Sequence, residues 1–404
     1  MGQADDKRFL GVSRNVFFLG WVSFLTDVSS DMIFYMFPLF LSHVLGVGAT
    51  FIGIIEGLGD SVATILKMGS GWASDRLGQR KGLTTLGYVL STVAKPFLLL
   101  ATSGAAALVV RFFERAGKGI RTSPRDALVA DSTSPETMGR AFGFHRALDT
   151  FGAVGGIAIA ALVIYLIQGW ESMLSLPSFQ WLIIIGVIPA VLSILVLVFF
   201  VHEARASRPE GGEVGAAAVG RGFDRRFKIF LAIMVLFTLG NSADIFLVLR
   251  ASDIGFSPLH ILLMLIPLNL VYAATSYPFG RLSDRIGRKR VIIAGWGIYA
   301  LIYLGFALAS PTWHLIYVIL LFALYGVYYG AAEGVTRAFV ADVVPSERRG
   351  TAYGLYHGAI GVSLLLASVI AGVLWEAINP AATFFFGAAM AGAAILGFAL
   401  LIRD

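Results

Sequence analysis

The chain has 404 residues, of which 57% are hydrophobic and only 14% are charged. Soluble domains average about 45–50% apolar and about 25% charged residues, so this composition excludes a soluble domain, which could not bury so much apolar surface. The chain has no cysteine, which excludes disulfides, thiol catalysis and thiolate metal sites. Its formal charge is +6, but the positions of the charges are more informative than their sum.

Apolar runs of about twenty residues recur along the whole chain, as is typical of membrane-spanning helices. The polar residues 1–15 are not followed by a short apolar segment with a cleavage site, so we expect the first run to be retained. The fold class expected is an all-α integral membrane protein with twelve transmembrane helices. Their expected limits are 16–43, 50–70, 82–102, 105–130, 140–167, 179–201, 227–250, 257–277, 291–309, 312–340, 350–376 and 381–402.

The longest connection, residues 202–226, is rich in Gly, Ala and charge and reads as a flexible linker. It separates an N-terminal six-helix bundle, 1–201, from a C-terminal six-helix bundle, 227–404. Lys and Arg gather in the connections on one side of this topology, and only Arg250 falls on the other. Because basic loops stay in the cytoplasm, we expect a multi-pass protein of the cell (inner) membrane with both termini and the linker cytoplasmic.

The two halves resemble each other at three places. The matching segments are GWASDRLGQRKG (71–82) with GRLSDRIGRKRV (280–291), ALVADSTSPETMGRAFGF (127–144) with AFVADVVPSERRGTAYGL (338–355) and, more weakly, VSSD (28–31) with NSAD (241–244). This repeat aligns Asp131 with Asp342 and Asp31 with Asp244. It predicts two similar bundles that face each other, with a binding site between them.

The first matching pair places glycines, an Asp-Arg pair and basic residues at fixed spacing. The residues are Gly71, Asp75, Arg76, Gly78 and Arg80 in one copy, and Gly280, Asp284, Arg285, Gly287 and Arg288 in the other. Glycine permits close backbone approach and a tight turn, and a carboxylate caps a helix start or pairs with an arginine.

We interpret this repeated cluster as a conformational latch on the cytoplasmic side, which closes when the protein opens outward. Asp131 and Asp342, at matching helix ends, are the expected partners of Arg76 and Arg285. The alternative is a charged anchor that only fixes the topology.

The pattern G-x-x-x-D-R-x-G-x-R-K resembles the loop motif between the second and third helices of the major facilitator superfamily. Its second copy resembles the counterpart between helices eight and nine. With the twelve apolar runs and the linker, the resemblance covers essentially the whole chain. The stretch ERAGKGIRTSPRDALVADS (114–132) further resembles a prokaryotic subgroup of this superfamily. The resemblance implies a secondary transporter that works by alternating access.

Ionisable residues within apolar runs are costly and usually functional. In the first half they include Lys118, His145, Arg146 and Asp149. The candidate site residues of that half are Asp27, Asp31, Glu56, Asp60, Lys95, Arg111, Glu114 and Arg115; the second half retains Asp244. With a rise of about 1.5 Å per residue, acids and bases fall in matching layers near the midplane. We predict that this set serves proton coupling or lines the substrate cavity. The alternative for Asp27 and Asp31 is a structural ion pair with Arg111 or Arg115.

Two further motifs, two histidines and three tyrosines are weaker indications of function. Arg111 resembles the arginine of a second superfamily motif, associated with proton coupling, although Gly117 and Gly119 follow it at shifted spacing. The glycines 152, 155 and 156 resemble an antiporter motif without its usual proline, and close helix packing is the alternative. We expect the histidines 145 and 357 to form hydrogen bonds between helices. The tyrosines 325, 328 and 329 either line the cavity or pack.

The function expected is proton-coupled secondary active transport of a small molecule, with export by proton antiport as the first choice. Buried carboxylates with nearby arginines can exchange partners as they titrate, which favours the proton as coupling ion. Alternatives are proton-linked transport of an organic anion or a metal ion, and a non-transporting membrane sensor. No G-x-x-x-x-G-K-[ST] signature is present, so ATP is not expected as the energy source.

The partners expected are a small-molecule substrate, protons and the lipid bilayer. We expect no nucleic acid, no cofactor, no metal site and a monomeric state. The sequence shows no nucleophile or metal cluster near an interface, so an enzyme is not expected.

Overall fold

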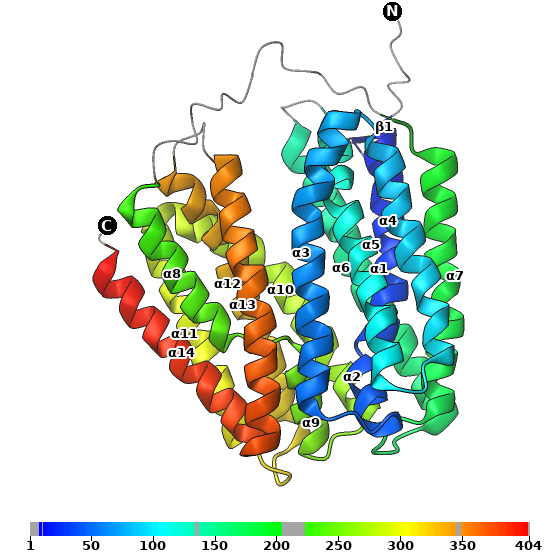
Figure 1. The fold of residues 1–404 in the computed structure, drawn as a ribbon, viewed down its shortest axis with the longest axis vertical. Helices are drawn as coiled ribbons and strands as arrows, with labels where there is room; N and C mark the ends of the chain where they lie inside the picture. The colour runs from blue at the N-terminus through cyan, green and yellow to red at the C-terminus, as the bar shows by residue number, and fades with distance from the viewer. Residues whose placement is uncertain (1–7, 10, 134–136, 204–222, 345–348, 403–404) are drawn as a thin grey trace, which may run out of the picture. The chain divides into compact units, whose positions relative to one another are not determined.

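The computed structural model describes residues 8–9, 11–133, 137–203, 223–344 and 349–402. A short hairpin of β1 (Arg8–Phe9) and β2 (Val12–Ser13) precedes the helices (Figure 1). The helices of the first half are α1 (Arg14–Phe34), α2 (Phe37–Leu39), the π-helix η1 (Phe40–Val44), α3 (Ala49–Leu77), α4 (Arg80–Ala94), the 3₁₀-helix η2 (Lys95–Leu100), α5 (Gly104–Asp131), α6 (Met138–Gln168) and α7 (Leu176–Phe200). Those of the second half are α8 (Arg225–Gly240), α9 (Ile245–Asp253), α10 (Pro258–Ile286), α11 (Arg288–Leu308), α12 (Leu315–Val343), α13 (Arg349–Ala377) and α14 (Pro380–Leu401).

Several helix starts follow directly from capping residues in the sequence. The side chains of Ser103, Ser175, Ser257 and Asn379 each accept a hydrogen bond from the backbone N–H three residues later. Such caps satisfy one of the backbone donors that a helix leaves unpaired at its N-terminus. These four side chains therefore fix where α5, α7, α10 and α14 begin.

Eleven helical segments in the described part of the chain are long and apolar enough to cross a membrane. The long helix outside this set is α5, whose apolar sequence is interrupted by Arg111, Glu114, Arg115 and further charges. Large apolar side chains such as Leu166 lie exposed on the helices, where lipid can cover them. The predicted class, an all-α membrane protein, is confirmed, whereas the count of twelve spans stays a prediction.

One expected helix, 227–250, is in fact two, because α8 ends at Gly240 and α9 begins at Ile245. Asn241 ends α8 in a non-helical conformation, as suits a side chain that competes for backbone hydrogen bonds. Side chains replace two lost helical bonds: the Tyr299 hydroxyl donates to the Gly240 carbonyl at 2.9 Å, and the Ala243 N–H donates to Ser368 Oγ at 3.4 Å. The helix expected over 16–43 is likewise divided after Phe34.

The chain forms two compact units. The first comprises Met1–Val47 and Leu58–Arg208, and the second comprises Gly48–Gly57 and Pro209–Asp404. The predicted linker, 202–226, lies for the most part outside the described residues, which omit 204–222. Because Gly48–Gly57 belongs to the second unit, the start of α3 is grouped with that unit. Hydropathy does not encode this feature.

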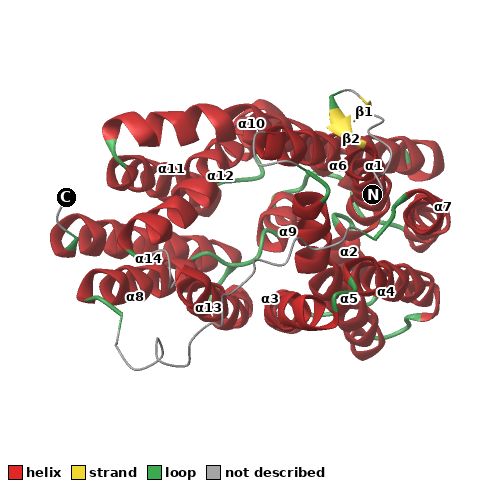
Figure 2. Cartoon of the chain, turned by 90° about the horizontal axis from the view of Figure 1, so that it is seen from above, coloured by secondary structure: helices red, strands yellow, loops and turns green. Residues whose placement is uncertain are grey.

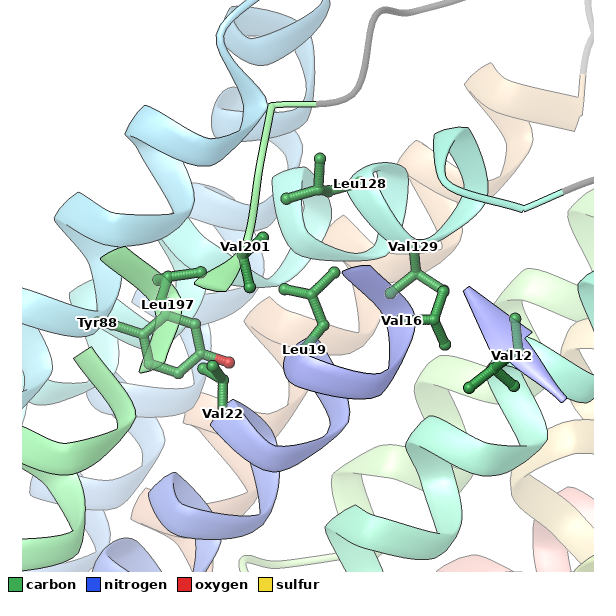
Figure 3. Packing of buried hydrophobic residues seen from close by; sticks show 10 residues of the cluster. Val12, Val16, Leu19, Val22, Tyr88, Leu128, Val129, Leu197 and Val201 are labelled. Carbon is green, nitrogen blue, oxygen red and sulfur yellow. The ribbon is translucent and has the colours of Figure 1, made fainter. Parts of the chain in front are cut away.

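In the first unit, α1 packs against α6 and α7, while α4 packs against α5 and α7. Figure 3 shows the apolar cluster at one end of this unit, where Leu19 of α1, Tyr88 of α4, Leu128 of α5 and Leu197 of α7 are fully buried. This cluster holds α1, α4, α5 and α7 together and so fixes the spacing of the polar residues further along α1 and α5.

In the second unit, α10, α11 and α12 contact one another, as do α8, α13 and α14. Seen along the helices, the two groups lie on opposite sides of this unit (Figure 2). Contacts between α11 and α14 join the two groups. Aromatic residues of α8, α11 and α12 meet in the interior, where the rings of Phe237 and Trp296 stack with centroids 4.5 Å apart.

Two of the three glycines noted in α6 lie against the backbone of α1. A Cβ atom on Gly152 would lie 2.5 Å from the Phe24 carbonyl oxygen, and one on Gly156 would lie 2.5 Å from the Val28 carbonyl oxygen. On Gly155 it would meet only a methyl group of Val28 at 3.6 Å, an ordinary contact. Close helix packing therefore accounts for two of these glycines.

We expect Gly156→Ala to reduce folded yield and thermal stability, because α1 and α6 must move apart to admit the new methyl group. Overpacking of this kind costs about 1–3 kcal/mol. Fluorescence-detected size-exclusion chromatography during heating would measure the loss. Gly155→Ala is the matched control and should behave like the unchanged protein; equal stability of the two variants would contradict this reading.

Candidate functional site: an ionic network in the first unit

Asp27 and Asp31 lie four residues apart on α1, and so on one face of the helix. Both side chains are partly exposed, and neither makes a hydrogen bond or ion pair with a described residue. Their cationic neighbours, at longer range, include Lys118, which acts on both, and Lys95, which acts on Asp31. Two partly exposed carboxylates within a membrane span thus have no direct partner among the described residues.

The charged row on α5 begins with a buried ion pair. Arg111 Nη1 lies 2.8 Å from Glu114 Oε2, and the two side chains are 5% and 3% exposed. The guanidinium also stands over the Phe34 ring, 4.1 Å from its centroid. Burial of such a pair is tolerable because each charge neutralises the other and the ring face favours a cation.

Arg115, one residue after Glu114, reaches across to α3, where its Nη2 lies 3.2 Å from Asp60 Oδ1. Arg111 and Arg115 are therefore engaged by Glu114 and Asp60. The alternative in which they pair with Asp27 or Asp31 is wrong among the described contacts. Glu114 lies three residues after Arg111 on the same helix, so the ion pair forms within α5.

Two further buried cations are held by hydroxyl groups. Lys95, at the junction of α4 and η2, donates from Nζ to Ser29 Oγ at 2.6 Å and to Ser30 Oγ at 3.1 Å. Arg121 donates to Ser91 Oγ at 2.6 Å. Neither forms an ion pair with a carboxylate in the described part of the chain. The serines of VSSD therefore position a cation one residue before Asp31.

A group linking α1, α5 and α6 was not predicted as part of the site. Ser23 Oγ lies 3.0 Å from His145 Nε2 and accepts a hydrogen bond from Arg125 Nη1 at 3.1 Å. His145 Nδ1 lies 3.5 Å from Asp149 Oδ2. The sequence placed His145 and Asp149 within one apolar run and predicted that His145 bonds between helices. Their link to Arg125 through Ser23 depends on the joint packing of three helices, so it could not be predicted.

The remaining predicted site residues lie in the second unit. Glu56 is buried and falls in the stretch Gly48–Gly57. Asp244, at the break between α8 and α9, accepts hydrogen bonds from the hydroxyls of Tyr325 at 2.8 Å and Tyr329 at 2.7 Å. Tyr325 and Tyr329 thus belong to a polar group around Asp244 as well as to the aromatic packing.

The repeated motif contains a glycine with positive φ at the turn between two helices in each unit. Gly78 and Gly287 adopt φ values of +65° and +97° between successive helices, a region that favours glycine. Gly71 approaches Ser123, whereas Gly280 has open space around it. The side chain of Asp75 lies outside the described residues.

The partners predicted for the two aspartates are corrected. Asp131 pairs with Arg80 at 2.8 Å, and Asp342 with Arg288 at 3.3 Å. These arginines lie just beyond the motif glycines, at the start of α4 and of α11. Arg76 instead stands over the Trp72 ring, Arg285 forms no ion pair with Asp342, and Asp284 pairs with Arg288. Each pair lies inside one unit, so the latch between units stays a hypothesis.

We expect Arg80→Asp to slow substrate transport several-fold while equilibrium binding stays within a few-fold, because the Arg80–Asp131 pair is remote from the charges within the span. Initial rates in proteoliposomes and binding in detergent would separate the two effects. The exchanged pair Arg80→Asp with Asp131→Arg should recover much of the rate. No recovery in a well-folded double variant would show that the ion pair itself is not what matters.

The fold and this network define a helical membrane protein whose first unit holds ionisable groups within its membrane spans. The chain belongs to the Major Facilitator Superfamily, whose family model matches residues 19–332 and 229–404. It is similar to an uncharacterized MFS-type transporter of Methanocaldococcus jannaschii, with 37% identity over 395 residues that cover 96% of this chain and 95% of the relative. The resemblance to this family is therefore confirmed, and the protein is a transporter by family.

Solved structures share the fold at low sequence identity. The nucleoside transporter NupG superposes with a TM-score of 0.78 and 14% identity, covering 96% of this chain and 99% of that chain. A POT family transporter in complex with thioalcohol conjugated peptide gives 0.79 and 13%, covering 97% and 96%. Identities this low speak for the fold alone.

Proposed function

We propose that the protein is a proton-coupled secondary active transporter that exports a small molecule by proton antiport and alternating access. The observation that carries the proposal is the pair Asp27 and Asp31, two partly exposed carboxylates without a direct partner within the span Arg14–Val44. A carboxylate that faces accessible space can take up and release a proton, whereas one locked in an ion pair is held ionised.

The surrounding charges supply the coupling. Lys118 lies in the electrostatic surroundings of both aspartates and Lys95 in those of Asp31, together with the carboxylate of Asp149. A movement that changes the distance between a carboxylate and these cations changes its affinity for a proton. If the two units rock during transport, proton binding and the conformational change become linked, as an antiporter requires.

Everted membrane vesicles test this proposal. Respiration acidifies their interior, and the quenching of an acridine dye reports the pH gradient. We expect at least one compound of a drug and metabolite library to restore fluorescence in vesicles with the unchanged protein and not with Asp27→Asn. Saturable uptake of that compound at the same rate after nigericin has collapsed the pH gradient would refute proton coupling.

A second candidate is proton-linked transport of an organic anion. It is favoured by Lys95, whose ammonium contacts hydroxyls and forms no ion pair with a described carboxylate. An anionic substrate would then be expected to lose affinity in Lys95→Met. The vesicle assay separates the two, because uptake with protons and exchange against protons change the interior pH in opposite directions.

We further propose that the protein is a monomer in the inner membrane. In the proposed orientation both termini lie in the cytoplasm. Since the chain has no native cysteine, single cysteines report their own position. A cysteine at Ser172, in the connection before α7, should react with an impermeant thiol reagent in intact cells. One at Gln79, between α3 and α4, should react only after permeabilisation. The reverse pattern would invert the topology.

A further inference from the structure

A pocket of about 270 Å³ lies within the second unit. The helices α8, α11, α12 and α13 supply its walls, together with the break after α8. Its lining includes the aromatic rings of Phe237, Trp296, Tyr328, Tyr329 and Tyr356, of which all but Tyr329 are buried. Rings held this firmly form flat apolar walls, against which a flat ring system packs better than a globular molecule.

Three polar groups of the pocket have hydrogen-bonding capacity that no described residue uses. Asn241 Nδ2 donates to the Tyr328 hydroxyl at 3.1 Å, which leaves the hydroxyl proton of Tyr328 and the Oδ1 atom of Asn241 without a partner. The hydroxyl of Thr238 likewise has no protein partner in the described part of the chain. The pocket thus offers one acceptor and two donors close to one another.

The charges of the pocket are already engaged with each other. Glu333 forms an ion pair with Arg337 and accepts a hydrogen bond from the Tyr272 hydroxyl. A ligand with a net charge would be attracted by one member of this pair and repelled by the other. The electrostatics of the pocket therefore favour an uncharged ligand, and its specificity lies in the hydrogen-bonding edge.

We propose that this pocket binds a flat, uncharged ring system with a hydrogen-bond donor and an acceptor on one edge, such as an aromatic lactam. The ligand's N–H would donate to Asn241 Oδ1, and its carbonyl would accept from Tyr328 or Thr238. Ligand pockets commonly measure about 300–1,000 Å³, so this one takes one or two fused rings. The inference rests on the proposed transport in one respect: it takes this ring to be part of the transported substrate.

The test uses purified full-length protein in detergent and three probes built on one scaffold. They are 2-quinolone, which is neutral with a lactam edge, the cation N-methylquinolinium, and the anion quinoline-2-carboxylate. Saturation-transfer NMR measures binding. We expect 2-quinolone to bind saturably and about tenfold more tightly than either charged probe. A tenfold difference in affinity corresponds to the cost of leaving one buried polar group without a hydrogen-bond partner. No binding of 2-quinolone, or tighter binding of a charged probe, would overturn the proposal.

Variants locate the site. Asn241→Leu removes the amide edge and should weaken 2-quinolone binding about tenfold, whereas Tyr328→Phe keeps the ring, removes one donor and should weaken it several-fold. Asn269→Leu is the control, since the Asn269 amide donates to the Leu265 carbonyl in α10 and does not line the pocket. Unchanged binding in Tyr328→Phe would place the probe elsewhere, even if Asn241→Leu does not fold.

The proposal for the pocket and the proposal for proton-coupled transport can be refuted independently. Proton-independent transport with intact 2-quinolone binding would refute the coupling and leave the pocket. Proton-coupled transport of compounds unrelated to 2-quinolone, without 2-quinolone binding, would refute the pocket and leave the coupling.

Discussion

Asp27→Asn is expected to abolish accumulation of substrate driven by a pH gradient and to spare exchange of substrate for substrate. Asparagine keeps the shape of the side chain but cannot take up or release a proton, and net transport requires both steps in each cycle. Exchange needs no net proton transfer and continues. Paired measurements of accumulation and counterflow in proteoliposomes would show a complete loss of the first and a rate within a few-fold for the second. Asp31→Asn should behave in the same way.

A purely structural role for Asp27 predicts a different outcome. Loss of a structural group reduces folded yield and lowers the unfolding temperature, and both modes of transport decline together. Asp253→Asn in α9 serves as the reference for a structural loss, because Asp253 pairs with Arg250, whose side chain is 9% exposed. A stable double variant of Asp27 and Asp31 that still accumulates substrate with unchanged pH dependence would eliminate both as coupling groups. Attention would then turn to Glu114 and Asp60.

The largest loss of stability is expected from Glu114→Gln. It removes the carboxylate 2.8 Å from Arg111, whose side chain is 5% exposed, and so takes an ion-pair partner from a buried charge. Breaking a buried ion pair in this way costs about 3–5 kcal/mol. Unfolding by titration with a denaturing detergent would measure the change, and folded yield would fall with it.

The double variant Arg111→Leu with Glu114→Leu distinguishes the loss of one charge of the pair from the loss of both. Removing both ions removes both desolvation costs, so this variant should be more stable than Glu114→Gln alone. Apolar replacement should nevertheless impair transport if the network responds to protonation. A double variant less stable than the single one would show that Arg111 has a stabilising role of its own, for which its position over the Phe34 ring is the candidate contact.

Much of the site could be predicted from the sequence because membrane spans make charges conspicuous. Asp27, Asp60, Glu114 and Arg115 stand out within apolar runs, and helical spacing places them in matching layers. The pairings could not be predicted in the same way. Arg115 reaches Asp60 on another helix, and Asp131 takes Arg80 rather than Arg76, choices that depend on helix rotation and on side-chain reach.

The division of the helix expected at 227–250 shows a second limit of sequence reasoning. Hydropathy averages over windows of about twenty residues, so a four-residue break leaves little trace in it. The signal was the polar tetrapeptide NSAD, aligned with VSSD but interpreted only as part of a repeat. The partners that stabilise the break, Tyr299 and Ser368, come from α11 and α13 and carry no local signature.

The interruption at residues 241–244 has a mechanical consequence. A continuous helix transmits a tilt from one end to the other. Here the ladder of backbone bonds ends with the Asn241 N–H and resumes with the Phe246 N–H, which donates to the Ala243 carbonyl. The two half-helices can therefore pivot about a joint, tethered by Tyr299 on one side and Ser368 on the other. Amide protons of the joint, with fewer backbone bonds to protect them, should exchange with heavy water before those in the middle of α8.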